Sequence, residues 1–437
     1  MVSSNTPAIS RTSVIWALAA AAAAPIIVFA ANGMVVLLAL LAFSVTNVDT
    51  IRDELRRIAA TPIGIALAGL VLWMIIGLWW TPEPLDAAEK IARLSLLWLA
   101  GIIAVASARQ MHPEILRYAG WVIPGFVFLV LLFYALELAS SGAIIGAVTG
   151  LNELDLTRIA DTAQREASRL NMKFNAIGRG ASLLAIFIWP AIAILLMNRT
   201  RSWRAGGVLV ITFITLLALP MAAAPLALAA GGIAWIIGYF APRFGPQILA
   251  ASALMVLVAM PFAARYVSEP ESLGIEASTV PISWQHRIGI WHFVSERIAE
   301  KPVLGWGMDA SRFIEGGNEQ IELTLPDGTK FHHASGNKMP LHPHSGPMQI
   351  WLELGLPGVV FAAIFLLGLA RLIAAPANAV YSRETKIGVA MASASAATAI
   401  SLACISFGLW QNWWQASFWF AAVLVTLALR RPSPATR

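Results

Sequence analysis

Residues 341–358, LHPHSGPMQIWLELGLPG, combine two histidines with the signals of a helix start. Ser345 fits an N-cap, Pro347 is tolerated in a first helical turn, and a long apolar run follows. His344 would then lie directly before a helix N-terminus, whose partial positive charge disfavours a protonated imidazole and favours a nearby anion. A neutral histidine there could remove a proton from a hydroxyl group. The alternative is an interfacial histidine with a solvated ring, and the neighbouring His342 weakens that alternative.

Two arginines could bind a phosphate at such a site. Arg179, in NAIGRGAS, lies at the start of an apolar run, where its planar guanidinium could approach a phosphate closely. An anchor at lipid headgroups explains Arg179 equally well from this segment alone. Arg287 lies in a stretch with helical periodicity, SWQHRIGIWHFVSER, and on its own it fits a solvated helix face. Two guanidiniums suit the two anionic groups of a pyrophosphate better than one.

Metal and nucleotide chemistry have weaker support. His332, His333, His342 and His344 follow the spacing H-H-x8-H-x-H, which matches no standard zinc pattern and has no cysteine beside it. The segment 303–311, VLGWGMDAS, has two glycines but no complete phosphate-binding pattern, and the chain has no Walker motif. We therefore expect no metal and no other cofactor, and a nucleotide-sugar enzyme or an ATP-driven transporter is disfavoured.

The elements that must position these residues are membrane-spanning helices. Of the 437 residues, 58% are hydrophobic and only 12% are charged, about half the charged share of a soluble protein. The net charge of +6 is explained by cations that set membrane topology, so we expect no nucleic-acid partner. The single cysteine, Cys404, lies in an apolar run and excludes a disulfide framework.

Apolar runs of spanning length recur along the chain and predict an all-α polytopic membrane protein with about 12 transmembrane helices. The predicted spans are 13–31, 33–48, 62–80, 91–107, 118–139, 180–197, 205–221, 222–240, 247–265, 348–371, 387–408 and 410–429. These spans contain almost no charge, whereas an ion-coupled transporter normally has charge near the midplane.

The positive-inside rule predicts that both termini are cytoplasmic. With that orientation, sixteen cations fall in inside segments, and Lys90 and Arg93 alone fall in short outside connections. The inside cations are Arg11, Arg52, Arg56, Arg57, Arg109, Arg117, Arg199, Arg201, Arg204, Arg243, Arg371, Arg383, Lys386, Arg430, Arg431 and Arg437. Arg179, Arg287 and His344 then share the outer face.

The chain divides into residues 1–265 with spans one to nine, a large outer loop at 266–347, and residues 348–437 with spans ten to twelve. The outer segment 140–179 predicts an amphipathic helix on the membrane surface. Its apolar stripe is Leu156, Ile159, Ala163, Ala167 and Leu170, with Arg158, Arg165 and Arg169 at polar positions. The large loop is predicted to be ordered and mostly helical: Trp284, Ile288, Trp291 and Ile298 form a helical stripe, and LTLPDGTKF predicts a hairpin with an Asp-Gly turn.

These segments together resemble the O-antigen ligase and polymerase superfamily. His344 and Ser345, followed by nine residues, Gly355, two residues and Gly358, fit its pattern H-[NSQ]-x9-G-x-x-[GTY]. WQHRIGIWHFVSERIAEKPVLGWGMDASR is similar to the segment that precedes this motif in the ligase branch, and FNAIGRGASLLAIFIWPAI resembles the arginine-bearing helix start. The motif support covers about 170–360.

The resemblance implies a class C-type glycosyltransferase of the bacterial inner membrane with a periplasmic active site. Its donor would be an O-antigen glycan on undecaprenyl pyrophosphate, its acceptor a hydroxyl of lipid A–core oligosaccharide, and its reaction inverting and metal-independent. By position, His344 would be the base, Arg179 and Arg287 would hold the leaving pyrophosphate, and His342 and Ser345 would contribute to substrate binding. Ser345 departs from the Asn that is common at its position.

Three alternatives remain open. A polymerase of the same superfamily would use a second lipid-linked repeat unit as acceptor, and a protein O-oligosaccharyltransferase would use a serine. The stretch around Arg287 favours ligation over both. A lipid or polysaccharide transporter would need a second polar cluster on the cytoplasmic side, where the sequence has only topology-setting arginines.

Overall fold

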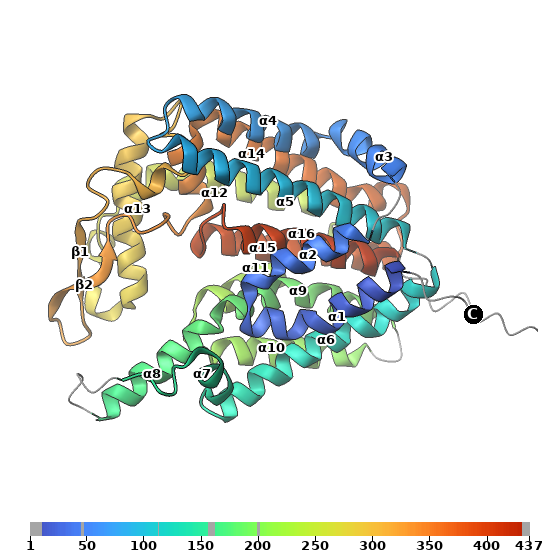
Figure 1. The fold of residues 1–437 in the computed structure, drawn as a ribbon, viewed down its shortest axis with the longest axis horizontal. Helices are drawn as coiled ribbons and strands as arrows, with labels where there is room; N and C mark the ends of the chain where they lie inside the picture. Colours follow the sequence, from blue (N-terminus) through green and yellow to red (C-terminus); the bar gives the residue numbers. More distant parts are fainter. Residues whose placement is uncertain (1–10, 45–47, 112, 156–161, 199–201, 431–437) are drawn as a thin grey trace, which may run out of the picture.

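The computed structural model describes residues 11–44, 48–111, 113–155, 162–198 and 202–430, which form a helical bundle (Figure 1). Its helices are α1 (Arg11–Phe29), α2 (Met34–Phe43), α3 (Val48–Ala59), α4 (Pro62–Ile76), α5 (Pro84–Gln110), α6 (Pro113–Ala139), α7 (Ala143–Thr149), α8 (Thr162–Ala176), α9 (Gly178–Met197), α10 (Trp203–Leu217), α11 (Ala223–Phe240), α12 (Gly245–Arg265), α13 (Ile282–Glu300), α14 (Gly346–Ala379), α15 (Arg383–Ile405) and α16 (Asn412–Arg430).

Helices occupy all twelve ranges in which the sequence predicts membrane spans. Within the described residues, eight helices are long and apolar enough to cross a membrane: α4, α5, α6, α9, α11, α12, α14 and α15. The apolar parts of α1, α2 and α10 are shorter. The all-α, polytopic class of the prediction agrees with this architecture. The prediction that Lys90 and Arg93 lie in a short connection is wrong: α5 begins at Pro84, so both residues lie in its first turns.

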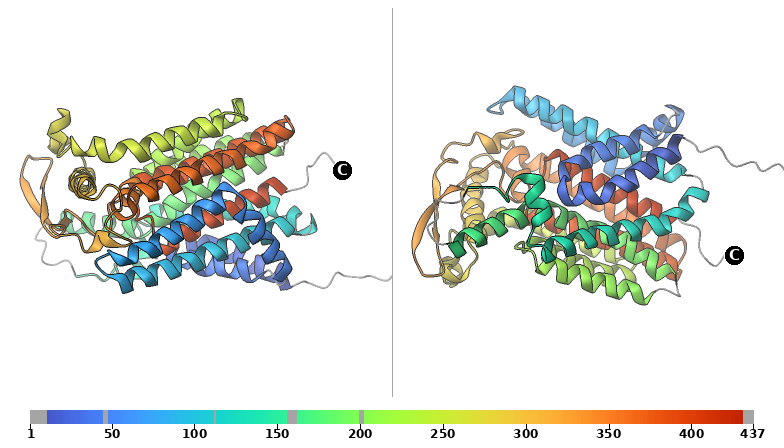
Figure 2. Two further views of the ribbon diagram at one scale, coloured as in Figure 1. Left: turned by 90° about the horizontal axis from the view of Figure 1, so that it is seen from above. Right: turned by 60° about the horizontal axis from the view of Figure 1, so that its bottom comes forward.

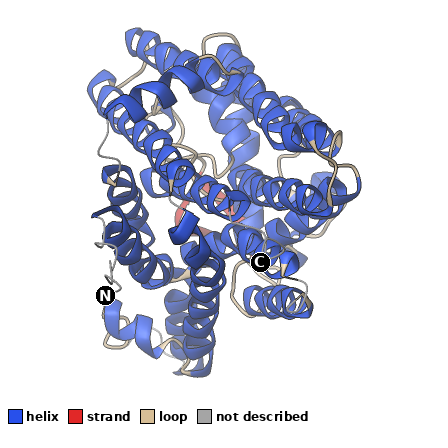
Figure 3. Cartoon of the chain, turned by 90° about the vertical axis from the view of Figure 1, so that its right-hand side faces the viewer, coloured by secondary structure: helices blue, strands red, loops and turns tan. Residues whose placement is uncertain are grey.

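Helix α9 lies inside the bundle, which Figure 3 shows from one end. It is apolar on every side, and 83% of its spanning window is buried, against 17% for α12. Helices α1, α6, α10, α11, α15 and α16 pack around it. A helix that is hydrophobic all round is expected in this surrounded position. Arg179, the second residue of α9, is therefore held at the end of the most enclosed element of the protein.

Residues 266–347 gather at one end of the bundle in all three ribbon views, and we call this the loop end (Figures 1 and 2). Helix α13 packs there against α12 and α14. The segment is ordered, as predicted, but it is not mostly helical: besides α13 and three short 3-10 turns it consists of a hairpin and irregular segments. The predicted stripe is only partly correct. The buried face of α13 includes Ile290, Phe293, Val294 and Ile298, whereas Trp284 and Ile288 are half-buried. The prediction treated tryptophan as a core residue, although its indole N–H needs a hydrogen-bond partner and therefore favours the boundary of a core.

The predicted hairpin is confirmed. Strands β1 (Gln320–Thr324) and β2 (Lys330–Asn337) pair antiparallel, with Thr324 opposite Lys330. Gly328 has φ 84°, a left-handed conformation that glycine adopts without a steric penalty. The Asp-Gly pair therefore forms the turn, as predicted.

The segment 140–179 contains α7 and α8, and α8 extends away from the bundle at the loop end (Figure 1). Leu170 is exposed and Arg169 donates to the backbone oxygen of Leu154. Of the predicted amphipathic set, Leu156, Arg158 and Ile159 lie outside the described residues, as do Arg199, Arg201, Arg431 and Arg437 of the predicted inside cations.

Helix α14 is interrupted at Gly355, whose φ of 59° and ψ of −156° are not helical. Residues 302–307 fill the break: the Trp306 and Gly307 amides donate to the carbonyls of Leu352 and Glu353 at 2.8 and 2.9 Å. A Cβ atom on Gly355 would lie 2.3 Å from the backbone oxygen of Val303. The glycines of VLGWGMD thus serve a backbone-to-backbone contact that attaches the large loop to the helix following the histidines.

Candidate functional site

The histidine pair lies at the loop end, directly before α14. The rings of His342 and His344 meet edge to face, with centroids 4.3 Å apart. Ser345 is the N-cap of α14, as predicted, and its side chain accepts from the amide of Met348. His344 has φ 53°, a backbone conformation that is uncommon for a residue with a side chain. The turn that it forms folds the two rings together.

His344 has one ring nitrogen committed to the protein. Its Nδ1 lies 2.7 Å from the backbone oxygen of Ser406. A carbonyl oxygen can only accept, so Nδ1 carries the proton and Nε2 of the neutral ring keeps its lone pair. Burial, together with the positive charge of Arg287, lowers the pKa of His344 to about 4. At neutral pH this side chain is an uncharged imidazole with an available basic nitrogen.

His342 has a hydrogen-bonding neighbour at each ring nitrogen. The backbone amide of His344 donates to its Nδ1 at 3.2 Å, and the side-chain amide nitrogen of Gln411 lies 3.2 Å from its Nε2. Burial and the neighbouring His344 lower the pKa of His342 to about 3, and the charges of Arg312 and Lys90 contribute to the shift. His342 therefore supports the backbone of His344, and both of its ring nitrogens are engaged by the protein.

Neighbouring elements hold this turn in place. Trp291 on α13 donates from its indole nitrogen to the backbone oxygen of Pro343 at 3.0 Å. The hydroxyl of Ser345 is fully buried and lies 3.2 Å from the sulfur of Met260 on α12. Because this hydroxyl also caps α14, its contacts are structural ones. The predicted substrate contact of Ser345 is untested.

Arg179 reaches the histidine pair through a short series of contacts. Its guanidinium lies over the ring of Trp413, 5.5 Å from the centroid, and Nη1 donates to Asn32 at 3.3 Å. Trp413 donates to Gln411 Oε1 at 2.9 Å, and Nε2 of the same Gln411 lies 3.2 Å from His342. The Arg179 side chain itself is exposed, so it is open to a ligand at this end of the bundle.

Arg287 lies on α13, near His344. Its guanidinium lies over the ring of Trp284, and Nη1 donates to the backbone oxygen of Ser283 at 3.0 Å. Burial lowers the pKa of Arg287, which remains charged at neutral pH. Its Nε is buried and has no hydrogen-bond partner among the described residues. A buried N–H of a charged group without a partner is costly, so an anionic ligand would complete this site.

A polar cavity of about 420 Å³ adjoins the histidine pair. Its walls come from the start of α5, the segment before α14, the turn between α15 and α16, and the residues around η6 (Ala310–Arg312). The lining residues are Asn32, Val35, Lys90, Arg93, Asp309, Arg312, Leu341, His342, Gln349, Gly408, Trp410, Gln411, Asn412 and Trp413. Two contacts of Arg179, Asn32 and Trp413, are among them, which links the cavity to the predicted phosphate-binding arginine.

The role of Glu353 was not predicted from the sequence. This fully buried side chain on α14 accepts from the amide of Asp309 at 3.0 Å and from the indole nitrogen of Trp410 at 2.9 Å. Ser311 and Gln349 also donate to it. The expectation that the spans contain almost no charge is wrong here, and also at the buried Glu137 of α6. A carboxylate in an apolar span was the available signal, because such groups need specific partners.

The histidines of the hairpin are separate from this pair. His332 is exposed on β2 and is paired across the hairpin with Glu322, while the side chain of His333 lies outside the described residues. Within the described part of the chain, no three His, Cys, Asp or Glu side chains come together in a group suited to a metal.

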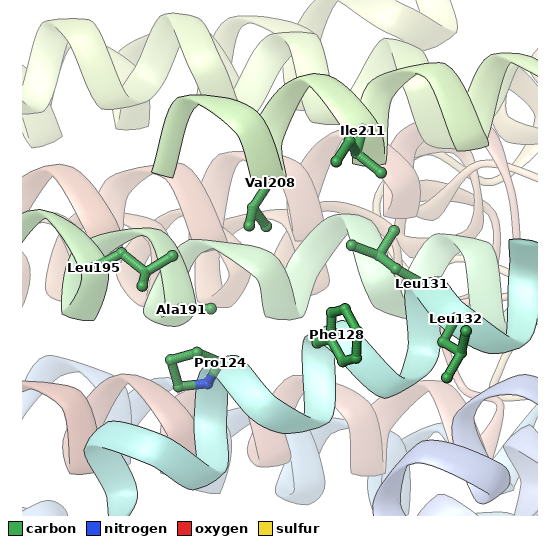
Figure 4. Close-up of a pocket in the computed structure, with 8 residues that line it drawn as sticks. All are labelled: Pro124, Phe128, Leu131, Leu132, Ala191, Leu195, Val208 and Ile211. Atoms are coloured by element: carbon green, nitrogen blue, oxygen red, sulfur yellow. The ribbon is translucent and has the colours of Figure 1, made fainter. Parts of the chain in front are cut away.

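A second pocket, of about 210 Å³, lies between α6, α9 and α10 (Figure 4). It is lined by Pro124, Phe128, Leu131, Leu132, Ala191, Leu195, Val208 and Ile211. Phe128 and Ile211 are more than half exposed, as expected for side chains that face lipid. With no polar side chain in its lining, this pocket offers no group for catalysis.

A known family matches this chain over a segment that contains the histidine pair but begins after Arg179. Residues 192–363 match the family model described as O-antigen ligase. A protein of Rickettsia conorii, provisionally named a polysaccharide ligase, is 28% identical over 359 residues, which cover 82% of this chain and 78% of the relative. A similarly named protein of Rickettsia felis is 31% identical over 262 residues, 58% of each chain. The matched range contains Arg287, both paired histidines and the break in α14.

Proposed function

Because this chain belongs to the O-antigen ligase family, we propose that it transfers a polysaccharide from undecaprenyl pyrophosphate to a hydroxyl of lipid A–core oligosaccharide. The reaction takes place on the periplasmic face of the bacterial inner membrane. The observation that carries the proposal is the fixed tautomer of His344: Nδ1 donates to Ser406, and the basic Nε2 remains available.

The chemistry is an inverting displacement at the anomeric carbon of the donor sugar. The acceptor oxygen forms the new bond to this carbon as its proton passes to His344 Nε2. The bond between the carbon and the pyrophosphate oxygen breaks, and undecaprenyl pyrophosphate departs with the bonding electrons. Arg179 and Arg287 neutralise the charge that develops on this leaving group. No metal or other cofactor enters the proposal.

The low pKa of His344 has a consequence for this mechanism. A pKa of about 4 keeps the imidazole unprotonated in the free enzyme but also makes it a weak base. A bound pyrophosphate would place negative charge beside the ring, oppose the effect of Arg287 and raise the pKa toward neutrality. Binding of the donor would thus strengthen the base when it is needed.

The names of the relatives favour a ligase over a polymerase or a protein O-oligosaccharyltransferase. In a strain that lacks the protein, a ligase deficiency leaves lipid-linked polymer together with uncapped core, whereas a polymerase deficiency leaves core capped by a single repeat unit. Gel analysis of lipopolysaccharide from the deletion strain separates these two outcomes.

The direct test joins donor to acceptor with the purified full-length protein in detergent. We expect His344→Ala to reduce transfer at least 10³-fold, the upper part of the range for loss of a general base, with unchanged expression and elution volume. His332→Ala, on the exposed hairpin, is the matched control and should retain wild-type transfer. Normal transfer by His344→Ala would disprove the mechanism, and absence of transfer by the wild-type protein would disprove the function.

A further inference from the structure

We propose that Lys90, Arg93 and Arg312 form an anion-binding site in the 420 Å³ cavity, additional to Arg179 and Arg287, which takes a phosphate group of one of the two substrates. The site deepens the proposed function and rests on it. Lys90 and Arg93 come from the start of α5 and Arg312 from η6, more than 200 residues later in the chain. Only the tertiary structure brings these cations together.

The cavity has more positive than negative charge. Three cations line it, and Asp309 is its one carboxylate among the described lining residues. Lys90 and Arg312 share that carboxylate: Lys90 forms an ion pair with Asp309 Oδ1, and Arg312 Nε lies 3.2 Å from the same oxygen. Arg93 pairs with Glu89 on the outer surface of α5. Among the lining side chains, three cations thus face one carboxylate, and an anion would balance the excess; Glu89 and Glu353 are not among the lining residues.

Arg312 has donors to spare. It uses Nε for Asp309, and within the described residues no hydrogen bond joins its two terminal nitrogens to the protein. Its side chain is 41% exposed, whereas that of Asp309 is 8% exposed. The carboxylate therefore fixes the Nε edge of the guanidinium, and the side chain lines the cavity. A fixed guanidinium with two free terminal NH2 groups suits a phosphate, which accepts two parallel hydrogen bonds.

The position of Asp309 is itself determined by the loop. Its backbone amide donates to the buried Glu353, and it has a left-handed φ of 62°. The same Glu353 accepts from Trp410, which also lines the cavity. Asp309, the partner of Lys90 and Arg312, is thus tied to a buried carboxylate, so these two cations are held in place before a ligand binds. Arg93 is the exposed member of the site.

Lys90, Arg93 and Arg312 line the cavity together with His342, whereas Arg287 is not among its described lining residues. The ring of His342 contacts that of His344. Positive charge is thus present near the histidine pair both in the cavity and at Arg287. One phosphate-bearing substrate at Arg287 and a second at Arg312 would bring their reacting groups close to the histidines. The anion could belong to the donor pyrophosphate or to a phosphorylated inner sugar of the acceptor, and the experiment separates these sources.

The experiment measures binding rather than turnover. The full-length protein is placed in nanodiscs of phosphatidylcholine, which has no net charge to compete for the site. The probes are farnesyl diphosphate for the donor, phosphorylated lipid A–core oligosaccharide for the acceptor, and the same glycolipid after phosphatase treatment. The variant is Arg93→Gln/Arg312→Gln. The control is Arg297→Gln, because Arg297 forms an equivalent pair with Glu300 three residues away but lies outside the cavity.

We expect the double variant to bind one phosphorylated probe at least tenfold more weakly, with Arg297→Gln within twofold of wild type. Weaker binding of farnesyl diphosphate assigns the site to the donor, and weaker binding of the phosphorylated glycolipid alone assigns it to the acceptor. Arg312→Lys, which keeps the charge, should restore part of the affinity. Unchanged binding of both phosphorylated probes would overturn the inference.

Two features keep the test decisive. Should the double variant fail to fold, Arg93→Gln alone changes an exposed side chain and is expected to weaken binding about threefold, with no change overturning the inference. The outcome is also independent of catalysis: a His344→Ala protein that still transfers glycan disproves the proposed mechanism, but it leaves the binding measurements and the anion site intact.

Discussion

At the scale of the residue, the two histidines have different tasks because their ring nitrogens are occupied differently. His344 donates through Nδ1 to a carbonyl oxygen and leaves Nε2 free, whereas His342 accepts through Nδ1 from the backbone. The sequence predicted His344 as the base and could not define a role for His342. The hydrogen bonds now support a positioning role for His342, since they fix the turn in which His344 has a left-handed backbone.

The first prediction at this scale concerns pH. Burial and Arg287 lower the pKa of His344 from its usual 6.5 to about 4, so the ring of the free enzyme stays neutral until the pH approaches 4. We expect kcat/KM to be nearly constant between pH 5.5 and 7.5 and to fall as the pH decreases toward 4, because the protonated ring cannot act as a base. Initial rates at low donor concentration measure this profile. A midpoint near 6.5 would show that His344 is not the titrating base or is not desolvated.

The second prediction concerns His342. In His342→Phe the ring packing is kept, but the acceptor for the His344 amide is lost. We expect kcat to fall about 10- to 100-fold with little change in KM, because a misplaced base affects chemistry more than binding. His342→Asn, whose Oδ1 can accept the same hydrogen bond, should recover most of the activity. If Phe and Asn reduce kcat equally, His342 does not act through this hydrogen bond.

At the scale of the element, the break in α14 connects the histidine turn to the large loop. Residues 302–307 donate and accept backbone hydrogen bonds on either side of Gly355. Two residues earlier, Glu353 accepts hydrogen bonds from Asp309, Ser311 and Trp410. The nine residues between Ser345 and Gly355 therefore have a physical meaning. They form the part of α14 between its N-cap, next to His344, and the break at which the large loop attaches.

The third prediction tests this attachment. In Gly355→Ala, a residue with a side chain must adopt φ 59°, and its Cβ would lie 2.3 Å from the Val303 oxygen. We expect a destabilisation of at least about 2 kcal/mol together with loss of transfer, because the loop must move. Thermal unfolding in detergent, with Gly206→Ala as control, measures the change. A Cβ on Gly206, in α10, meets no atom within 4 Å, so the control should unfold like the wild type.

At the scale of the whole molecule, the predicted site residues come from three distant parts of the chain. Arg179 begins the central helix, Arg287 lies on α13, and His344 precedes α14. Helix α12 leads into residues 266–347 at the loop end and α14 leads out of them (Figure 2). Arg179 is linked to the histidine pair through Trp413 and Gln411. The proposed topology puts this end in the periplasm, where a lipid-linked donor provides its own leaving group.

The fourth prediction tests that topology. In a Cys404→Ala background, Leu273→Cys places a thiol at the loop end and Val48→Cys places one on α3, and both positions are exposed. A membrane-impermeant maleimide applied to spheroplasts should label Leu273→Cys alone. After permeabilisation both variants should react. Labelling of Val48→Cys in intact spheroplasts would place the proposed active site in the cytoplasm and contradict the function.

Local patterns explain which features were predictable from the sequence. The N-cap at Ser345, the Asp-Gly turn and the twelve helical ranges each depend on a few neighbouring residues, and each is present in the structure. The predictions that were wrong concern features that depend on contacts with distant segments of the chain. The buried face of α13 is set by α12 and α14, and the buried Glu353 is tolerated because the loop supplies its donors.

The sequence by itself determined that the chain is an apolar helical bundle with a histidine at a helix start, because hydrophobic periodicity and capping operate within a few turns. The tertiary structure alone decided which ring nitrogen of His344 is free, since Ser406 lies 62 residues away. It also decided that Lys90, Arg93 and Arg312 share a cavity. Contacts between distant segments follow from how helices pack, and the spacing of residues along the chain contains no direct record of them.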